Sequence, residues 1–202
     1  MVNRDKLILD DLKKFRILNR DQIIAMHFNH LKQKVVVCNN VMKRLRRDGY
    51  VTACTESQPY NYFLNPSPIK KDSKKIPHFN AISEFYIEVC KYEKPRLFNV
   101  EPKLAEKSTI EPDCFMIVFN SPIFVEIQRS IYSAKVMQQK INRYKAYFES
   151  DEWMNLEWQG EKKFFPYIWI ITDYKYKLDN VSPLQIFQTK DVNEFMETVV
   201  KQ

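Results

Sequence analysis

The chain has 202 residues, of which 45% are hydrophobic and 28% are charged, a balance typical of a folded globular protein. Its only glycines, Gly49 and Gly160, exclude the glycine-rich phosphate loop, the dinucleotide-binding turn and the nucleophile elbow, because each needs at least two glycines close together. The longest apolar stretch, around residues 164–172, is too short to span a bilayer, and the four cysteines form no CxxC pair, so we expect a cytoplasmic protein that does not enter a membrane.

The positive charge is concentrated in the N-terminal third of the chain. Residues 1–75 contain 16 lysines and arginines against 7 acids, a net charge of +9. Residues 76–202 contain 16 lysines and arginines against 18 acids, a net charge of −2. Because cations gathered on one part of a chain indicate a polyanionic partner, we expect the N-terminal third to bind nucleic acid.

Two short helices are predicted at the start of the chain, over about residues 3–16 and 20–28. The second has a clear beginning, because Asn19 at its N-cap and Gln22 three residues later fit a variant of the capping box. A third helix ends at Gly49, a residue that readily adopts the left-handed conformation found just after many helices.

The third helix has an apolar face and a polar, cationic face. Val37, Val41 and Leu45 recur every four residues and form the apolar face. The polar face carries amide and cationic side chains, namely Lys34, Asn39, Asn40, Lys43, Arg44, Arg46 and Arg47. Such a face is also found on ordinary helices, where it is simply solvated.

A β-hairpin is predicted directly after this helix, from two β-prone runs at residues 50–55 and 60–64. Three short helices followed by a hairpin are typical of a winged helix-turn-helix domain, whose third helix lies in the major groove of duplex DNA. We therefore predict a DNA-binding domain over residues 1–65, with the seven polar side chains of the third helix on the DNA.

A linker and a second domain follow. Residues 66–77 hold three prolines and four lysines with little apolar character, which predicts a linker. Residues 78–202 contain a further set of predicted elements, with helices at about 79–92, 133–149 and 190–200, and strands at 96–100, 114–119, 123–128, 166–172 and 184–188. This is an α+β arrangement in which helices cover one sheet.

The candidate site lies on two of these strands, joined by a predicted turn at Asn120-Ser121. Strand alternation places Glu126 and Gln128 on one face, and a two-residue turn places Asp113 opposite Gln128 and diagonal to Glu126. A register shifted by one residue would move Asp113 to the other face. Two converging carboxylates favour a bound cation, and Mg²⁺ prefers carboxylates, water and substrate phosphate as its ligands.

Pro112-Asp113, twelve intervening residues and then Glu126-Ile127-Gln128 resemble the PD-(D/E)xK nuclease signature, with glutamine at the lysine position. The whole chain is similar to the replication-relaxation proteins of Gram-positive plasmids and mobile elements. This resemblance implies a restriction-endonuclease-like domain over residues 78–202, with a mixed sheet flanked by helices. It also implies a DNA-binding protein of plasmid replication or transfer.

The same resemblance implies roles for individual residues. Asp113 and Glu126 would be catalytic metal ligands, and Glu84 would be a third acid at the metal. Gln128 would stand at the lysine position, where it cannot supply a positive charge near an attacking water. The placement of the following helix, and not the resemblance, suggests that Lys140 or Arg143 would supply that charge instead.

Three functions are open at this point. The first is a DNA-binding protein of plasmid replication or transfer whose second domain is non-catalytic. The second is a Mg²⁺-dependent DNA endonuclease that the winged helix brings to its target. The third is a transcriptional regulator whose second domain dimerises or senses a ligand. The paired acids favour the first two, while nuclease activity, the DNA sequence bound and the formation of a homodimer are left open.

Overall fold

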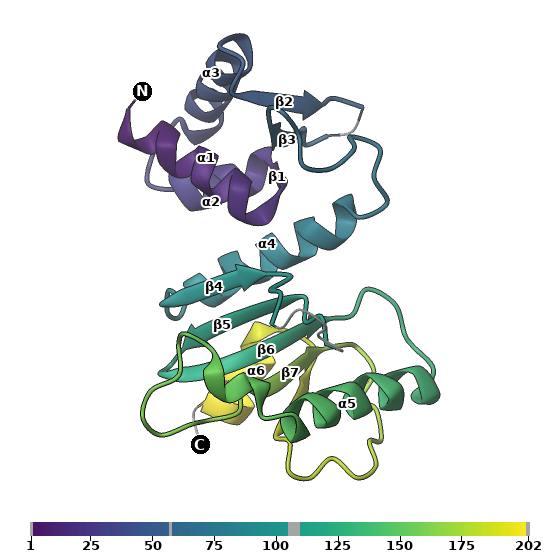
Figure 1. Cartoon of the computed structure of the whole chain (residues 1–202). Coiled ribbons are helices and arrows are strands. Elements are labelled where there is room, and N and C mark those ends of the chain that lie inside the picture. The colour runs from purple at the N-terminus through teal and green to yellow at the C-terminus, as the bar shows by residue number, and fades with distance from the viewer. Residues whose placement is uncertain (1, 57, 105–109, 201–202) are drawn as a thin grey trace. The chain divides into compact units, whose positions relative to one another are not determined.

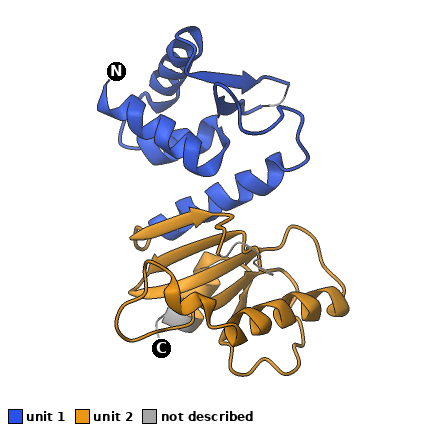
Figure 2. Cartoon of the chain, viewed as in Figure 1, with its two compact units in different colours: residues 1–91 blue, residues 92–202 orange. Residues whose placement is uncertain are grey.

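A computed structural model describes residues 2–56, 58–104 and 110–200 of the chain (Figure 1). The chain divides into two compact units, residues 1–91 and residues 92–202 (Figure 2). Helices and strands occur in both units, so the predicted α+β class is confirmed. Within the described ranges, no helix is both long enough and apolar enough to cross a membrane.

The N-terminal unit contains a small antiparallel sheet and four helices among its described residues. In chain order its elements are α1 (Asn3–Phe15), β1 (Leu18–Asn19), α2 (Arg20–His27), α3 (Lys34–Arg47), β2 (Val51–Cys54), β3 (Asn61–Leu64) and α4 (Ile76–Cys90). The central strand β3 pairs with both β1 and β2. The predicted three helices and hairpin are therefore present, together with β1, which is too short to show an alternating pattern in the sequence.

The start of α2 follows from its capping residues. The Asn19 side chain accepts hydrogen bonds from the backbone N–H groups of Asp21 and Gln22, both at 2.9 Å. The Gln22 side chain accepts one in return from the Asn19 N–H at 3.0 Å. The predicted capping box is thus confirmed, and it satisfies backbone donors that would otherwise lack a partner at a helix start.

α3 buries most of the apolar face that the sequence predicts, although Val37 is only partly buried. The side chains turned inward are 0–7% exposed and comprise Cys38, Val41, Met42 and Leu45. Fully buried residues of the neighbouring elements, including Ile8, Leu12 and Phe63, complete the core of this unit. The chain leaves α3 through Gly49, whose φ of 81° a residue without Cβ adopts with little strain.

α4 belongs to the N-terminal unit, whereas the sequence places a domain boundary at residues 66–77. Its apolar face packs on α1, α2 and β1, with Phe79 and Ile82 fully buried. The Tyr86 ring lies 5.2 Å from the ring of Phe15. The helical pattern alone shows that α4 has an apolar face but does not show which unit covers that face.

The C-terminal unit is built on a five-stranded sheet in the order β4-β5-β6-β7-β8. Its strands are β4 (Leu97–Val100), β5 (Cys114–Val118), β6 (Ser121–Ile127), β7 (Tyr167–Ile171) and β8 (Ile186–Thr189). Its helices are α5 (Ala134–Glu149) and α6 (Val192–Phe195), with a 3₁₀ turn at Glu152–Asn155 and a π turn at Met196–Val200. β4, β5 and β6 pair antiparallel, and β6, β7 and β8 pair parallel.

The two faces of this sheet are covered by different helices (Figure 1). On one face, the Phe124 ring of β6 lies 5.8 Å from the Tyr144 ring of α5. On the other, the Trp169 ring of β7 stacks on Phe195 of α6 at 3.8 Å. Because successive strand residues point to opposite faces, the even-numbered positions of β6 face α5.

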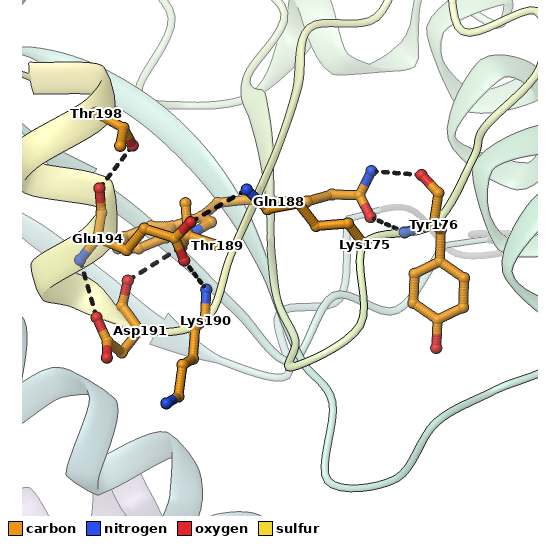
Figure 3. A network of polar contacts seen from close by, with 9 residues as sticks. Lys175, Tyr176, Gln188, Thr189, Lys190, Asp191, Glu194 and Thr198 are labelled. Atoms are coloured by element: carbon orange, nitrogen blue, oxygen red, sulfur yellow. Dashed lines mark hydrogen bonds and ion pairs between the residues drawn. The ribbon is translucent and has the colours of Figure 1, made fainter.

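Polar contacts fasten the segment between β7 and β8 to β8 and cap α6 (Figure 3). The Gln188 side chain accepts from the Tyr176 N–H at 2.7 Å and donates to the Tyr176 carbonyl at 3.0 Å. The Asp191 side chain accepts from the Glu194 N–H at 2.9 Å, which caps α6. The two Gln188 contacts hold the segment on the α5 side of the sheet, because Gln188 is aligned with Ile170 and Glu126 across the strands.

The hairpin between β5 and β6 turns at Phe119-Asn120, so the predicted turn at Asn120-Ser121 is wrong by one residue. Both turn residues have positive φ, 51° and 55°, as a type I′ turn requires. The residues that flank a two-residue turn exchange backbone hydrogen bonds, and Pro122 has no N–H to donate. The observed turn puts Ser121 in the flanking position and moves Pro122 to the next pair, opposite Ile117, which needs no such bond.

Candidate functional site

The candidate site is formed by two strands of the C-terminal unit and by α5. The observed register pairs Cys114 with Val125, and β5 begins at Cys114, so Asp113 lies just before the strand and, contrary to expectation, is not paired with Gln128. Asp113 is nevertheless close enough to Glu126 for its charge to act on that carboxylate.

Glu126 is almost fully enclosed, with 2% of its surface exposed. The Tyr144 hydroxyl donates a hydrogen bond to Glu126 Oε1 at 2.6 Å, and Lys140 Nζ contacts Oε2. Lys140 and Tyr144 are four residues apart on α5, a spacing that puts both side chains on the helix face toward the sheet. Each Glu126 oxygen therefore has a donor from the same helix.

Asp113 has a backbone partner. Its Oδ2 accepts a hydrogen bond from the Ile127 N–H at 2.6 Å, which ties the start of β5 to the end of β6. Burial raises the pKa of Asp113, while the nearby Lys140 ammonium and the Ile127 N–H act in the opposite direction. Asp113, Glu126, Lys140 and Tyr144 thus form one electrostatic group, here named the carboxylate cluster.

Burial also dominates the electrostatics of Glu126 and raises its pKa to about 7. Lys140 favours the charged carboxylate, and the neighbouring Asp113 disfavours it. Burial likewise raises the pKa of Tyr144 well above its ordinary value, so its hydroxyl stays protonated and continues to donate. The carboxylate cluster can therefore hold or release a proton at Glu126 near neutral pH.

Gln128 does not join the carboxylate cluster through any hydrogen bond. Its amide nitrogen and oxygen are both buried and, among the described residues, both lack a partner. Of the two cations that the sequence analysis names, Lys140 contacts Glu126. Arg143 lies on the exposed side of α5. The hydrogen bond from Tyr144 was not predicted, because this tyrosine falls on the apolar stripe of α5.

Glu84, proposed from the sequence as a third acid, lies on α4 in the N-terminal unit. There its carboxylate accepts a hydrogen bond from the Gln22 side chain at 3.4 Å. The described part of the chain contains no group of three or more His, Cys, Asp or Glu residues placed to hold a metal ion. At Glu126, the Lys140 ammonium takes the position next to the carboxylate that a metal cation would need.

The polar face of α3 is a second candidate site. Asn39, Asn40, Lys43 and Arg46 are exposed, and their side chains make no hydrogen bond or ion pair with any described residue. Lys34 donates to the Asn29 side chain at 3.0 Å.

Two arginines of α3 are paired in different ways. Arg47 forms an exposed ion pair with Asp48 at 3.0 Å. Arg44 instead donates to both carboxylate oxygens of Asp5, at 3.0 and 2.8 Å, and Asp5 is fully buried. The sequence contains a sign of this pair, since Asp5 lies three residues before Ile8 on the apolar face of α1.

The geometry defines an α+β protein whose N-terminal unit has four described helices, one with a cationic face, and whose C-terminal unit has a mixed five-stranded sheet with a buried carboxylate cluster. The model of the replication-relaxation family matches residues 9–166, more than three quarters of the chain. The protein belongs to this family, as its resemblance in sequence implies, and membership indicates a role in replication or transfer of plasmids or mobile elements. No curated protein and no solved structure matches the chain.

Proposed function

We propose that this protein binds duplex DNA through α3 in the replication or transfer of a plasmid or mobile element. The order α1-β1-α2-α3-β2-β3, with β1 paired to β3, is the order expected of a winged helix. In that fold the third helix enters the major groove. The main support is the exposed face of α3, where Lys43 and Arg46 have no acidic partner among the described residues.

The distribution of charge supports the same proposal. Residues 1–91 have a net charge of +8 and residues 92–202 have a net charge of −1. Because each phosphate neutralised by a lysine or arginine releases bound counterions, binding through such a unit weakens steeply as salt is added. The proposed contacts to DNA come from Lys34, Asn39, Asn40, Lys43, Arg46 and Arg47. Arg44 is left out because its guanidinium is held by Asp5.

The salt dependence of DNA binding tests this proposal. The variant Lys43→Ala/Arg46→Ala is compared with Lys162→Ala/Lys163→Ala, which removes the same charge from exposed positions of the C-terminal unit. Each lost phosphate contact lowers the slope of log affinity against log salt by roughly 0.9, so the α3 variant should lose a slope of about 2. The control should keep the wild-type slope. Equal slopes in all three proteins would exclude α3 as the DNA-binding surface.

A second candidate, a Mg²⁺-dependent nuclease, is favoured by one observation. Asp113 acts electrostatically on Glu126, and Lys140 of the adjacent helix contacts Glu126, which suits a nuclease-like core. As arranged, however, the carboxylates do not fit a metal ion, because both oxygens of Glu126 already accept from Lys140 and Tyr144. The contacts therefore agree better with a second domain that has no nuclease activity.

Incubation of supercoiled and linear DNA with Mg²⁺ or Mn²⁺ separates the two candidates. Wild type is compared with Glu126→Ala and with Glu126→Gln, which keeps the size of the buried side chain. Cutting by wild type that both variants lose, while duplex binding is retained, would establish a nuclease. Intact DNA after incubation with pure wild type on several substrates would establish a second domain without nuclease activity.

A further inference from the structure

The outward face of α3 is divided along its length. Val36, Asn40, Lys43 and Arg47 follow the spacing i, i+4, i+7 and i+11, so they form one line along the helix, opposite its buried side. The first half of this line bears an apolar side chain and an amide. The second half bears two cations. A face used only to attract phosphate would not need this division.

Val36 is the unusual member of the line. It is 55% exposed, although a β-branched apolar side chain on a solvated helix face favours neither the helix nor solubility. Asn40, one turn later, is also exposed and forms no side-chain hydrogen bond with a described residue. Neither side chain is explained by the packing of the N-terminal unit.

Resting on the proposed function, we propose that Val36 and Asn40 read the edges of A·T base pairs, whereas Lys43 and Arg47 contact phosphates. The N-terminal residues of a recognition helix contact base edges in the major groove. There, an apolar side chain suits the 5-methyl group of thymine, and asparagine suits the N6 and N7 atoms of adenine. The ligand is therefore duplex DNA with A·T pairs at defined positions.

The spacing along α3 agrees with this assignment. A separation of four residues corresponds to about 6 Å along the helix, and stacked base pairs repeat about every 3.4 Å. Val36 and Asn40 therefore face base pairs about two steps apart. The hairpin turn at residues 55–60 has one acid and no lysine or arginine, so it supplies no cation for a competing contact to the minor groove.

The first experiment tests the thymine contact. Full-length protein selects its preferred duplexes from a random-sequence pool, and each thymine of the selected site is then replaced by deoxyuridine, which removes only the methyl group. Wild type should lose roughly fourfold in affinity at one thymine, the loss expected for one buried methyl group. Val36→Ala should be insensitive to that replacement. Val35→Ala is the matched control, because Val35 is 43% exposed but lies off the outward line, and it should keep the wild-type sensitivity.

The second experiment tests the adenine contact in the same duplex. Replacing one adenine by 7-deazaadenine removes the N7 acceptor and should weaken wild-type binding roughly tenfold. Asn40→Ala should be unaffected by the replacement. Asn39→Ala, which removes the neighbouring exposed amide, should keep the tenfold ratio between the two duplexes, whatever its overall affinity for DNA. Thermal unfolding of all four variants checks that these exposed substitutions leave the fold intact.

The outcomes separate base reading from DNA binding. Binding of every duplex with a steep salt dependence and no preferred sequence would overturn the base-reading assignment and leave DNA binding by α3 in place. So would a sequence preference that Val36→Ala and Asn40→Ala both retain. Failure to bind any duplex would overturn the proposed function as well.

Discussion

Glu126 combines near-complete burial with two donors, and burial has the larger effect on its proton affinity. Its folded-state pKa of about 7 lies above its ordinary value of 4.5. Between these values the folded chain holds a proton that the unfolded chain releases, so its stability should fall as pH rises through this window, by roughly 3 kcal/mol at most. Glu126→Gln should flatten this decline, which urea unfolding at pH 5 and pH 7.5 measures. A variant with the same pH dependence as wild type would contradict the assignment.

Arg44 has a structural role that its place on a cationic face conceals. Arg44→Ala would leave the fully buried Asp5 carboxylate without its guanidinium partner, and we expect a loss of about 3 kcal/mol in unfolding free energy. Arg46→Ala, on the exposed face of the same helix, should change stability by less than about 0.5 kcal/mol. Chemical denaturation measures both. The control is the same substitution in an Asp5→Asn background, which has no buried carboxylate. If Arg44→Ala then lowers the unfolding free energy by no more than Arg46→Ala does, the Asp5–Arg44 ion pair accounts for the loss.

At the scale of elements, local signals predict helices and strands well. The capping residues Asn19 and Gln22 mark the start of α2, and Gly49 marks the end of α3. The strand alternation turns Glu126 toward one face of the sheet, where Lys140 and Tyr144 of α5 contact it. The exact turn is missed because asparagine suits either of the central positions, and only the missing N–H of Pro122 decides between the two registers.

The hairpin turn can be tested with glycine, which adopts positive φ freely. Asn120→Gly should maintain or raise stability, because residue 120 has a φ of 55° in the observed turn. Ser121→Gly should destabilise by roughly 0.5–1 kcal/mol, because Ser121 lies in β6 and glycine weakens a strand. If the turn were at Asn120-Ser121, residue 121 would have a positive φ and Ser121→Gly would not destabilise the protein. Urea unfolding of the two variants therefore distinguishes the registers.

At the scale of the molecule, two features could not be predicted because they depend on contacts distant in sequence. Arg44 pairs with Asp5, which is 39 residues away in the sequence. α4 packs on α1, α2 and β1, although a lysine-rich segment that resembles a linker separates it from them in the sequence. The sequence does predict the concentration of positive charge. The structure adds that this charge lies within one compact unit, whose boundary falls at residue 91 rather than within residues 66–77.

This boundary makes a prediction about fragments. A fragment of residues 1–91 should unfold cooperatively and should bind duplex DNA with the salt dependence of the whole chain. A fragment of residues 1–75 lacks α4 and the burial of Phe79, Ile82, Phe85, Tyr86 and Val89. These five side chains contribute on the order of 10 kcal/mol, which is comparable with the whole stability of a small domain, so the shorter fragment should not fold. Circular dichroism during heating compares the two. Cooperative unfolding of residues 1–75 would show that α4 is dispensable, and failure of residues 1–91 to fold would show that this unit depends on the rest of the chain.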